Sequence, residues 1–87
     1  MKYICMEGKD GKLEIFLFPR SIDHDAMAEV LDGIKNHTQG NWERVFRYPV
    51  SAGFVDHTGT CHGLSETLGL EANGSRDTEL LTQQGLF

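Results

Sequence analysis

Two runs of strand-forming residues at the start of the chain, separated by a cluster of turn residues, constrain its fold most. The runs are Lys2–Met6 and Leu13–Phe18, and the six residues between them include Gly8 and Gly11. This arrangement is typical of an antiparallel β-hairpin. The second run is apolar on both of its faces, which favours a central place in a sheet or a face turned towards a partner.

An amphipathic helix is predicted after the hairpin. Asp23 is a good N-cap residue, with Ile22 and Met27 at the two positions of a hydrophobic staple. We expect this helix to end near Lys35, and residues 37–41 to form a polar loop. Its predicted buried stripe, at helical spacing, consists of Met27, Val30, Leu31 and Ile34.

Further strands are expected in the second half of the chain. Trp42–Tyr48 is aromatic and β-prone, and Pro49 is expected to break or bend the chain before a fourth strand, Val50–Val55. Thr60–Leu64 is a candidate fifth strand after a tight turn.

A short helix is predicted to close the chain, with Ser75 or Asp77 as its cap and Gly85 at its end. The predicted order is therefore ββαββ(β)α. It corresponds to an α+β fold in which the helices pack on one face of an antiparallel sheet. With 87 residues, we expect a single domain spanning 1–87.

The sequence predicts a cytoplasmic protein. No stretch approaches the roughly 18 consecutive apolar residues of a membrane helix, so no membrane partner is expected. The opening residues include Lys2 and Glu7 and are too soon charged for a secretory signal. Without an export signal, Cys5 and Cys61 are expected to be free thiols in a reducing compartment.

The negative charge is concentrated towards the end of the chain. The formal net charge is −5, from 8 basic and 13 acidic residues. Beyond residue 49, Arg76 is the only Lys or Arg, set against Asp56, Glu66, Glu71, Asp77 and Glu79. This sign disfavours direct binding to phosphate backbones, so we expect no nucleic-acid partner.

The densest group of reactive side chains lies in the segment 56–62. His57, Cys61 and His62 are candidate zinc ligands, because thiolate and imidazole suit that ion. Their spacing is not one of the paired patterns of zinc sites, and adjacent Cys61 and His62 on a strand would point to opposite faces. A small metal- or ligand-binding protein using these three residues is one alternative function. We expect no other cofactor.

No catalytic constellation emerges. Cys61 has a neighbouring histidine that faces away if the segment is extended, and the serines lack a nucleophile-elbow pattern. The carboxylates show no pair in an apolar setting that would tune an acid against a base. We therefore expect no enzymatic activity.

An aromatic face on the third predicted strand is the candidate interaction surface. Trp42, Arg44, Phe46 and Tyr48 share one face by the two-residue period of a strand. These residue types are enriched in interface hot spots. Burial of the same face under a helix is the other interpretation.

Three segments carry a resemblance to a known group of proteins. Residues 50–55 (VSAGFV), 61–70 (CHGLSETLGL) and 75–81 (SRDTELL) resemble the C-terminal half of small uncharacterised bacteriophage and prophage proteins. The opening Met-Lys-Tyr-Ile strand is also similar to theirs. The resemblance carries over no catalytic residue, and it implies a small accessory protein in a bacterial cytoplasm.

We therefore expect a non-enzymatic accessory protein of phage or prophage type that binds another, unidentified protein. Self-association through a strand edge is part of this hypothesis. A further alternative is an acidic mimic of nucleic acid. Its carboxylates, Glu66, Glu71, Asp77 and Glu79, would have to compete with one charge per about 1.7 Å of duplex.

Overall fold

The computed structural model describes residues 1–38 and 40–87, with residues 36–38, 41 and 47 described by their backbone. Its main sheet contains β1 (Lys2–Gly8), β2 (Leu13–Phe18), β5 (Phe46–Val55) and β6 (Cys61–His62). The strands lie in the order β2-β1-β5-β6, and every neighbouring pair is antiparallel. The predicted α+β class, the antiparallel sheet and the opening hairpin are therefore confirmed.

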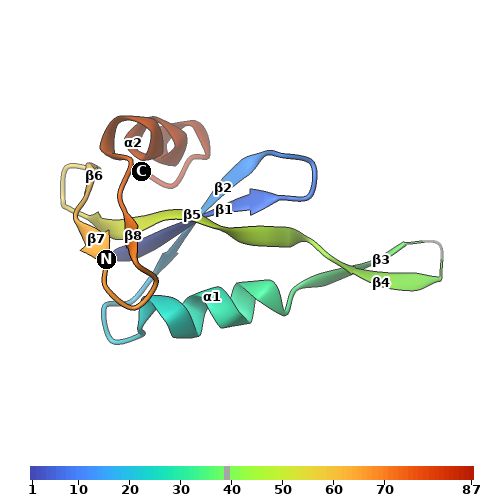
Figure 1. Ribbon diagram of the computed structural model, residues 1–87. Helices are drawn as coiled ribbons and strands as arrows, with labels where there is room; N and C mark the ends of the chain where they lie inside the picture. The colour runs from blue at the N-terminus through green and yellow to red at the C-terminus, as the bar shows by residue number, and fades with distance from the viewer. Residues whose placement is uncertain (39) are drawn as a thin grey trace.

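The two helices, α1 (His24–Asp32) and α2 (Gly74–Gln83), cover opposite faces of this sheet (Figure 1). The expectation that both helices pack on one face is therefore wrong. The reason lies in β1, whose consecutive residues 3–6 are all buried. Because side chains alternate between the two faces of a strand, a strand of this kind needs cover on both.

Each face of the sheet has its own hydrophobic core. The core under α2 contains the buried residues Tyr3, Cys5, Ile15, Val55, Cys61 and Leu81. The core above α1 contains the buried residues Ile4, Met6, Phe18, Leu31, Phe46 and Ala52. The doubly apolar β2 adds side chains to both cores although it is an edge strand, so the expectation of a central position for β2 is also wrong.

Helix α1 is shorter than expected and turned relative to its predicted stripe. It ends at Asp32, with Gly33 as its C-cap residue. Leu31 is buried, but Val30 is 63 % exposed and Ile34 is also exposed. The buried His24, four residues ahead of Ala28, lies on the face turned to the sheet. Asp23 is the N-cap residue as predicted, without a side-chain cap bond.

Most of the predicted loop 37–41 is a β-hairpin: residues 37, 38 and 41 lie in strands and Gly40 in a turn, and residue 39 lies outside the described residues. β3 (Lys35–Thr38) pairs with β4 (Asn41–Arg44) as a separate two-stranded sheet, and Gly40 has a φ of 83° in the connecting turn. A positive φ is favourable for glycine because it has no Cβ. The break in the predicted third strand falls at Val45, whereas Pro49 lies inside β5, at a register shift against β1.

The last third of the chain contacts both faces of the sheet: Leu68 and Leu70 pack against the core above α1, and Ala72 and Leu81 belong to the core under α2. After β6, the short strands β7 (Leu64–Ser65) and β8 (Leu70–Glu71) form a second two-stranded sheet. The side chain of Asn73 caps α2, accepting from the Arg76 backbone N–H at 3.4 Å, in place of the predicted Ser75 or Asp77. No helix among the described residues is long and apolar enough to cross a membrane.

Candidate interaction surface

The β3–β4 hairpin, hereafter the arm, projects from the rest of the molecule (Figure 1). Its two strands pair with each other from Lys35↔Arg44 to Thr38↔Asn41. The molecule is correspondingly elongated, with principal extents of 44 × 26 × 18 Å. We call everything outside residues 35–44 the body. The described side chains of β4, Trp42, Glu43 and Arg44, therefore belong to neither hydrophobic core.

The structure divides the predicted aromatic face. Trp42, on the arm, is 70 % exposed, whereas Phe46 is only 6 % exposed and packs edge-on against the Phe16 ring at 5.1 Å between centroids. Tyr48 is 50 % exposed. The register against β1 explains the division, because Tyr48 lies opposite Glu7 and Phe46 opposite Gly8.

Two neighbouring residues of β1 point to opposite faces, so their partners do as well. An irregularity in the pairing at this step of β5 therefore turns Tyr48 and Phe46 to different sides. A regular two-residue period, on which the predicted common face depends, does not hold here. Trp42 and Arg44 remain together on β4, and Phe46 belongs to the core.

The base of the arm is held on both sides. Arg44 forms an ion pair with Asp32 at the end of α1, at 3.2 Å, and Glu43 forms one with Lys9 in the β1–β2 turn. The backbone of Val45 also bonds to both neighbours: its N–H donates to the Ile34 carbonyl, and its carbonyl accepts from the Lys9 N–H. The ion pairs are largely exposed and each contributes at most about 1 kcal/mol.

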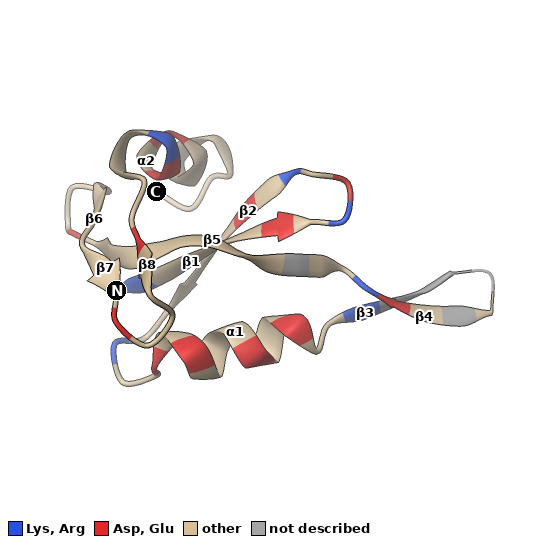
Figure 2. Ribbon diagram, viewed as in Figure 1, with Lys and Arg blue, Asp and Glu red and all other residues tan. Residues whose placement is uncertain are grey.

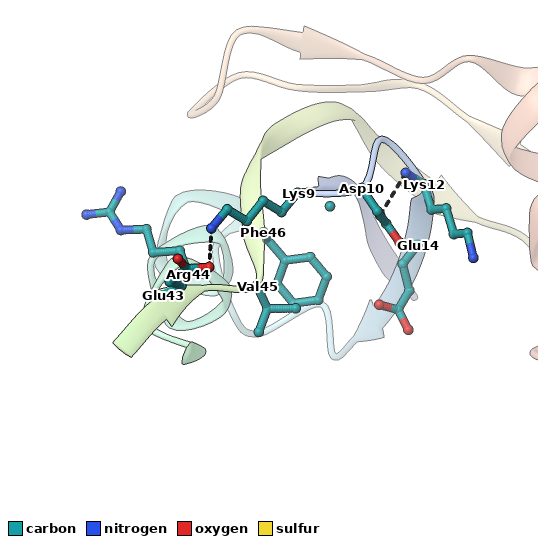
Figure 3. Close-up of a pocket in the computed structure, with 9 residues that line it drawn as sticks. Lys9, Asp10, Lys12, Glu14, Glu43, Arg44, Val45 and Phe46 are labelled. Atoms are coloured by element: carbon teal, nitrogen blue, oxygen red, sulfur yellow. Dashed lines mark hydrogen bonds and ion pairs between the residues drawn. The ribbon is translucent and has the colours of Figure 1, made fainter. Parts of the chain in front are cut away.

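A groove of about 410 Å³ lies between the arm base and the β1–β2 turn (Figure 3). Phe46 and Val45 form its apolar part. Basic and acidic side chains alternate around it, including Lys12 and Glu14 on the hairpin. Because charges of both signs line the groove, it offers no preference for an anionic or a cationic small molecule. We regard this groove as part of the junction between the arm and the body, and not as a ligand-binding site.

The three predicted metal ligands lie around the β5–β6 connection. Cys61 is buried under α2, and His62, the next residue on β6, stacks on the Phe54 ring with centroids 6.3 Å apart. His57 is exposed in the turn before β6. Among the residues that the structure describes, no group of three or more His, Cys, Asp or Glu side chains is arranged to hold a metal ion.

A second pocket, of about 470 Å³, lies over the start of α1 and is lined by His24, Lys2 and Phe54 among others. His24 is 4 % exposed, and its Nε2 lies 3.0 Å from the Gly53 carbonyl oxygen. The Phe18 and Phe54 rings meet it edge-on at 5.3 and 5.8 Å. These contacts give His24 a structural role: it is a core histidine with a hydrogen-bond partner, and it joins α1 to the sheet.

A buried carboxylate, which sequence reasoning missed, organises the opposite face. Asp77 is fully buried. Its Oδ2 accepts from the Tyr3 hydroxyl at 2.6 Å, the Ser51 hydroxyl at 2.7 Å and the Asn73 backbone N–H at 3.1 Å. Its Oδ1 accepts from Arg76 Nε at 3.2 Å.

This network joins β1, β5 and α2 through a single side chain. Arg76 also donates to the Ser51 hydroxyl at 3.0 Å, which closes a ring of contacts around the carboxylate. Burial of Asp77 removes it from the acidic surface that a nucleic-acid mimic would need. Three other acidic residues, Asp25, Glu29 and Asp32, lie on α1, and Figure 2 shows the red acidic segments along this helix.

The two thiols are held in their protonated form. Burial raises the pKa of Cys5 to about 11, with the nearby Asp77 charge adding to the effect. Burial also raises the pKa of Cys61. Because the thiolate is the reactive species, both cysteines are poor nucleophiles near neutral pH.

Models of protein families, curated proteins and solved structures were compared with this chain, and none of them matches it.

Proposed function

We propose that this chain binds another protein through its arm, as a small non-enzymatic accessory protein of phage or prophage type in the cytoplasm. The observation that carries the proposal is Trp42, a tryptophan 70 % exposed on a hairpin that stands clear of both cores. Most of this large aromatic side chain is exposed to water, and it belongs to neither core. Tryptophan is among the residues most enriched at interface hot spots.

The chemistry of the arm indicates what its partner offers. The indole ring has an apolar body and one N–H donor, so it fits an apolar pocket with a hydrogen-bond acceptor at its wall. Glu43 and Arg44 follow Trp42 on β4 and form ion pairs with Lys9 and Asp32 of the body. Holding these neighbours in place lowers the entropy lost when the arm is bound.

Partner capture from the source cells tests the proposal, with Trp42→Ala compared against the wild-type chain. Val30→Ala is the matched control, because Val30 is also a large exposed apolar residue but lies on α1. We expect a protein that is retained by the wild type and by Val30→Ala, and is lost with Trp42→Ala. Equal retention by all three chains would exclude the arm as the binding surface.

A further inference from the structure

One side chain closes the exposed edge of the main sheet. Gln84 follows α2, and its Oε1 accepts from the Ile15 backbone N–H at 2.9 Å. Its Nε2 donates to the Leu13 backbone carbonyl at 3.0 Å. A residue of an adjacent parallel strand would make the same two bonds with β2, its carbonyl accepting from Ile15 and its N–H donating to Leu13. The amide of Gln84 therefore stands in for a missing neighbouring strand.

The backbone places Gln84 at this edge with precision. The Gly85 N–H donates to the Thr82 carbonyl at 3.1 Å and the Leu86 N–H to the Leu81 carbonyl at 3.0 Å. With a φ of 71° at Gly85, these two bonds form a Schellman motif that ends the helix. Gln84 is the C-cap residue of this motif, so its position relative to α2 is fixed.

The same helix also caps the other edge of the sheet. The Thr78 hydroxyl accepts from the Cys61 backbone N–H of β6 at 2.9 Å. Side chains of the α2 segment thus satisfy backbone groups on β2 and on β6, the two outer strands. An uncovered strand edge is a template for pairing with another chain.

We propose that the edge of β2 is a pairing surface for the β2 strand of a second copy of this chain, and that Gln84 keeps it closed. The Leu13 carbonyl and the Ile15 N–H point outwards from the sheet to Gln84. By the two-residue alternation of a strand, the backbone groups of Leu17 point outwards as well. In an antiparallel pairing centred on Ile15, the Ile15 residues of the two copies lie opposite each other. Leu13 of each copy then lies opposite Leu17 of the other.

That arrangement is symmetric, since each copy offers the other the same residues. It satisfies all outward backbone groups of the three residues and continues the apolar pattern of β2 on both faces. Pro19, which has no N–H to donate, lies outside the paired segment. This surface does not involve Trp42, so the inference goes beyond the arm and stands independently of it.

Sedimentation equilibrium of Gln84→Ala tests the inference. Gln83→Ala is the matched control, because Gln83 is the preceding residue and its side chain contacts Glu79 on α2. We expect the self-association constant of Gln84→Ala to exceed that of Gln83→Ala by about tenfold or more, since two bonds no longer have to be broken before pairing. A folded Gln84→Ala chain that associates no more than the control would overturn the inference.

A second measurement covers the case in which Gln84→Ala folds poorly. In Gln84→Glu the side chain can still accept from the Ile15 N–H but can no longer donate to the Leu13 carbonyl. We expect its self-association to lie between those of Gln83→Ala and Gln84→Ala. Amide exchange should show Ile15 protected in the wild type, and protected in the variant only at concentrations where it is dimeric. An Ile15 amide that exchanges freely in the wild type would contradict the closing role of Gln84.

Discussion

The body and the arm are held by different forces. In the body, β1 is buried on both faces, and a carboxylate with no exposed surface accepts hydrogen bonds from side chains of β1, β5 and α2. The arm pairs its two strands with each other and is tied to the body by exposed ion pairs and the backbone of Val45. The difference separates the residues that set stability from those available for binding.

This separation has a physical basis. A buried polar group that loses its partner bears the full cost of desolvation, whereas an exposed one regains its bonds from water. Substitutions around Asp77 should therefore act on the free energy of unfolding. Substitutions on the arm should act mainly on binding.

The largest effect is expected at Asp77. Asp77→Ala removes the acceptor of the Tyr3 and Ser51 hydroxyls inside the body. We expect the free energy of unfolding to fall by about 3–5 kcal/mol, as when one partner of a buried charged pair is removed. Chemical denaturation measures this fall, with the exposed Glu29→Gln as control. A fall of less than about 1 kcal/mol would mean that the carboxylate does not organise the body.

Tyr3→Phe sharpens the same point with a smaller change. The substitution keeps the ring and removes the hydroxyl that donates to Asp77 at 2.6 Å. A hydrogen bond to a charged group contributes about 1.5–3 kcal/mol, which is the destabilisation we expect in urea unfolding. Burial, together with the bond to Asp77, raises the pKa of Tyr3 well above its usual range. The tyrosine absorbance of the folded protein should therefore not show Tyr3 ionising at pH 10. Normal ionisation there would show that the hydroxyl is not held by Asp77.

Trp42→Ala should leave stability almost unchanged. Surface substitutions away from special features alter the free energy of unfolding by no more than about 0.5 kcal/mol. Binding to the captured partner, in contrast, should weaken by about 2 kcal/mol or more if Trp42 is a hot spot. Calorimetry of unfolding and of binding on the same variant gives both values. A destabilised variant with unchanged binding would reverse the roles assigned to the arm and the body.

The ion pairs at the arm base should contribute least. We expect Lys9→Ala and Arg44→Ala each to cost no more than about 1 kcal/mol, because both pairs are substantially exposed. Added salt should reduce even this effect by screening the charges. A larger loss that persists at 1 M salt would show that the arm and the body are coupled more tightly than their contacts indicate.

The hydrogen bonds of Asp56 in the turn between β5 and β6 should make the free energy of unfolding depend on pH. Hydrogen bonds from the Thr58 hydroxyl and the Thr60 backbone lower the pKa of Asp56 to about 2. A lowered folded-state pKa stabilises the folded chain above the usual aspartate pKa of about 3.9, and this stabilisation is lost as the pH falls towards 2. Between pH 5 and pH 2, the free energy of unfolding of Asp56→Asn should therefore change less with pH than that of the wild type. An unchanged profile would contradict the bonded turn.

The features that could be predicted from the sequence depend on local patterns. The hairpin 2–18 is specified by two strand-forming runs around turn residues, and α1 by apolar spacing and Asp23. The arm was missed because residues 35–38 are polar and carry no alternation, so their strand character comes from pairing with β4. Polar pairing of this kind leaves little trace in composition.

The Asp77 network was missed for a different reason. An aspartate in the first turn of a helix is typical of a cap or a dipole partner, and nothing near Asp77 in the sequence marks it as buried. Its hydroxyl partner Tyr3 is 74 residues away along the chain. The division of the aromatic face between Phe46 and Tyr48 was equally invisible, since it arises from the irregular pairing of β5 with β1.

Native-state hydrogen exchange tests most directly whether the body and the arm are energetically separate. We predict that the amides of β1 and β5 exchange only through global unfolding, and that Asp77→Ala accelerates them. The amides of β3 and β4 should exchange through smaller openings whose free energy Asp77→Ala leaves unchanged. A single opening free energy for the amides of all four strands, lowered equally in Asp77→Ala, would contradict this separation. The arm and the body would then be one cooperative unit.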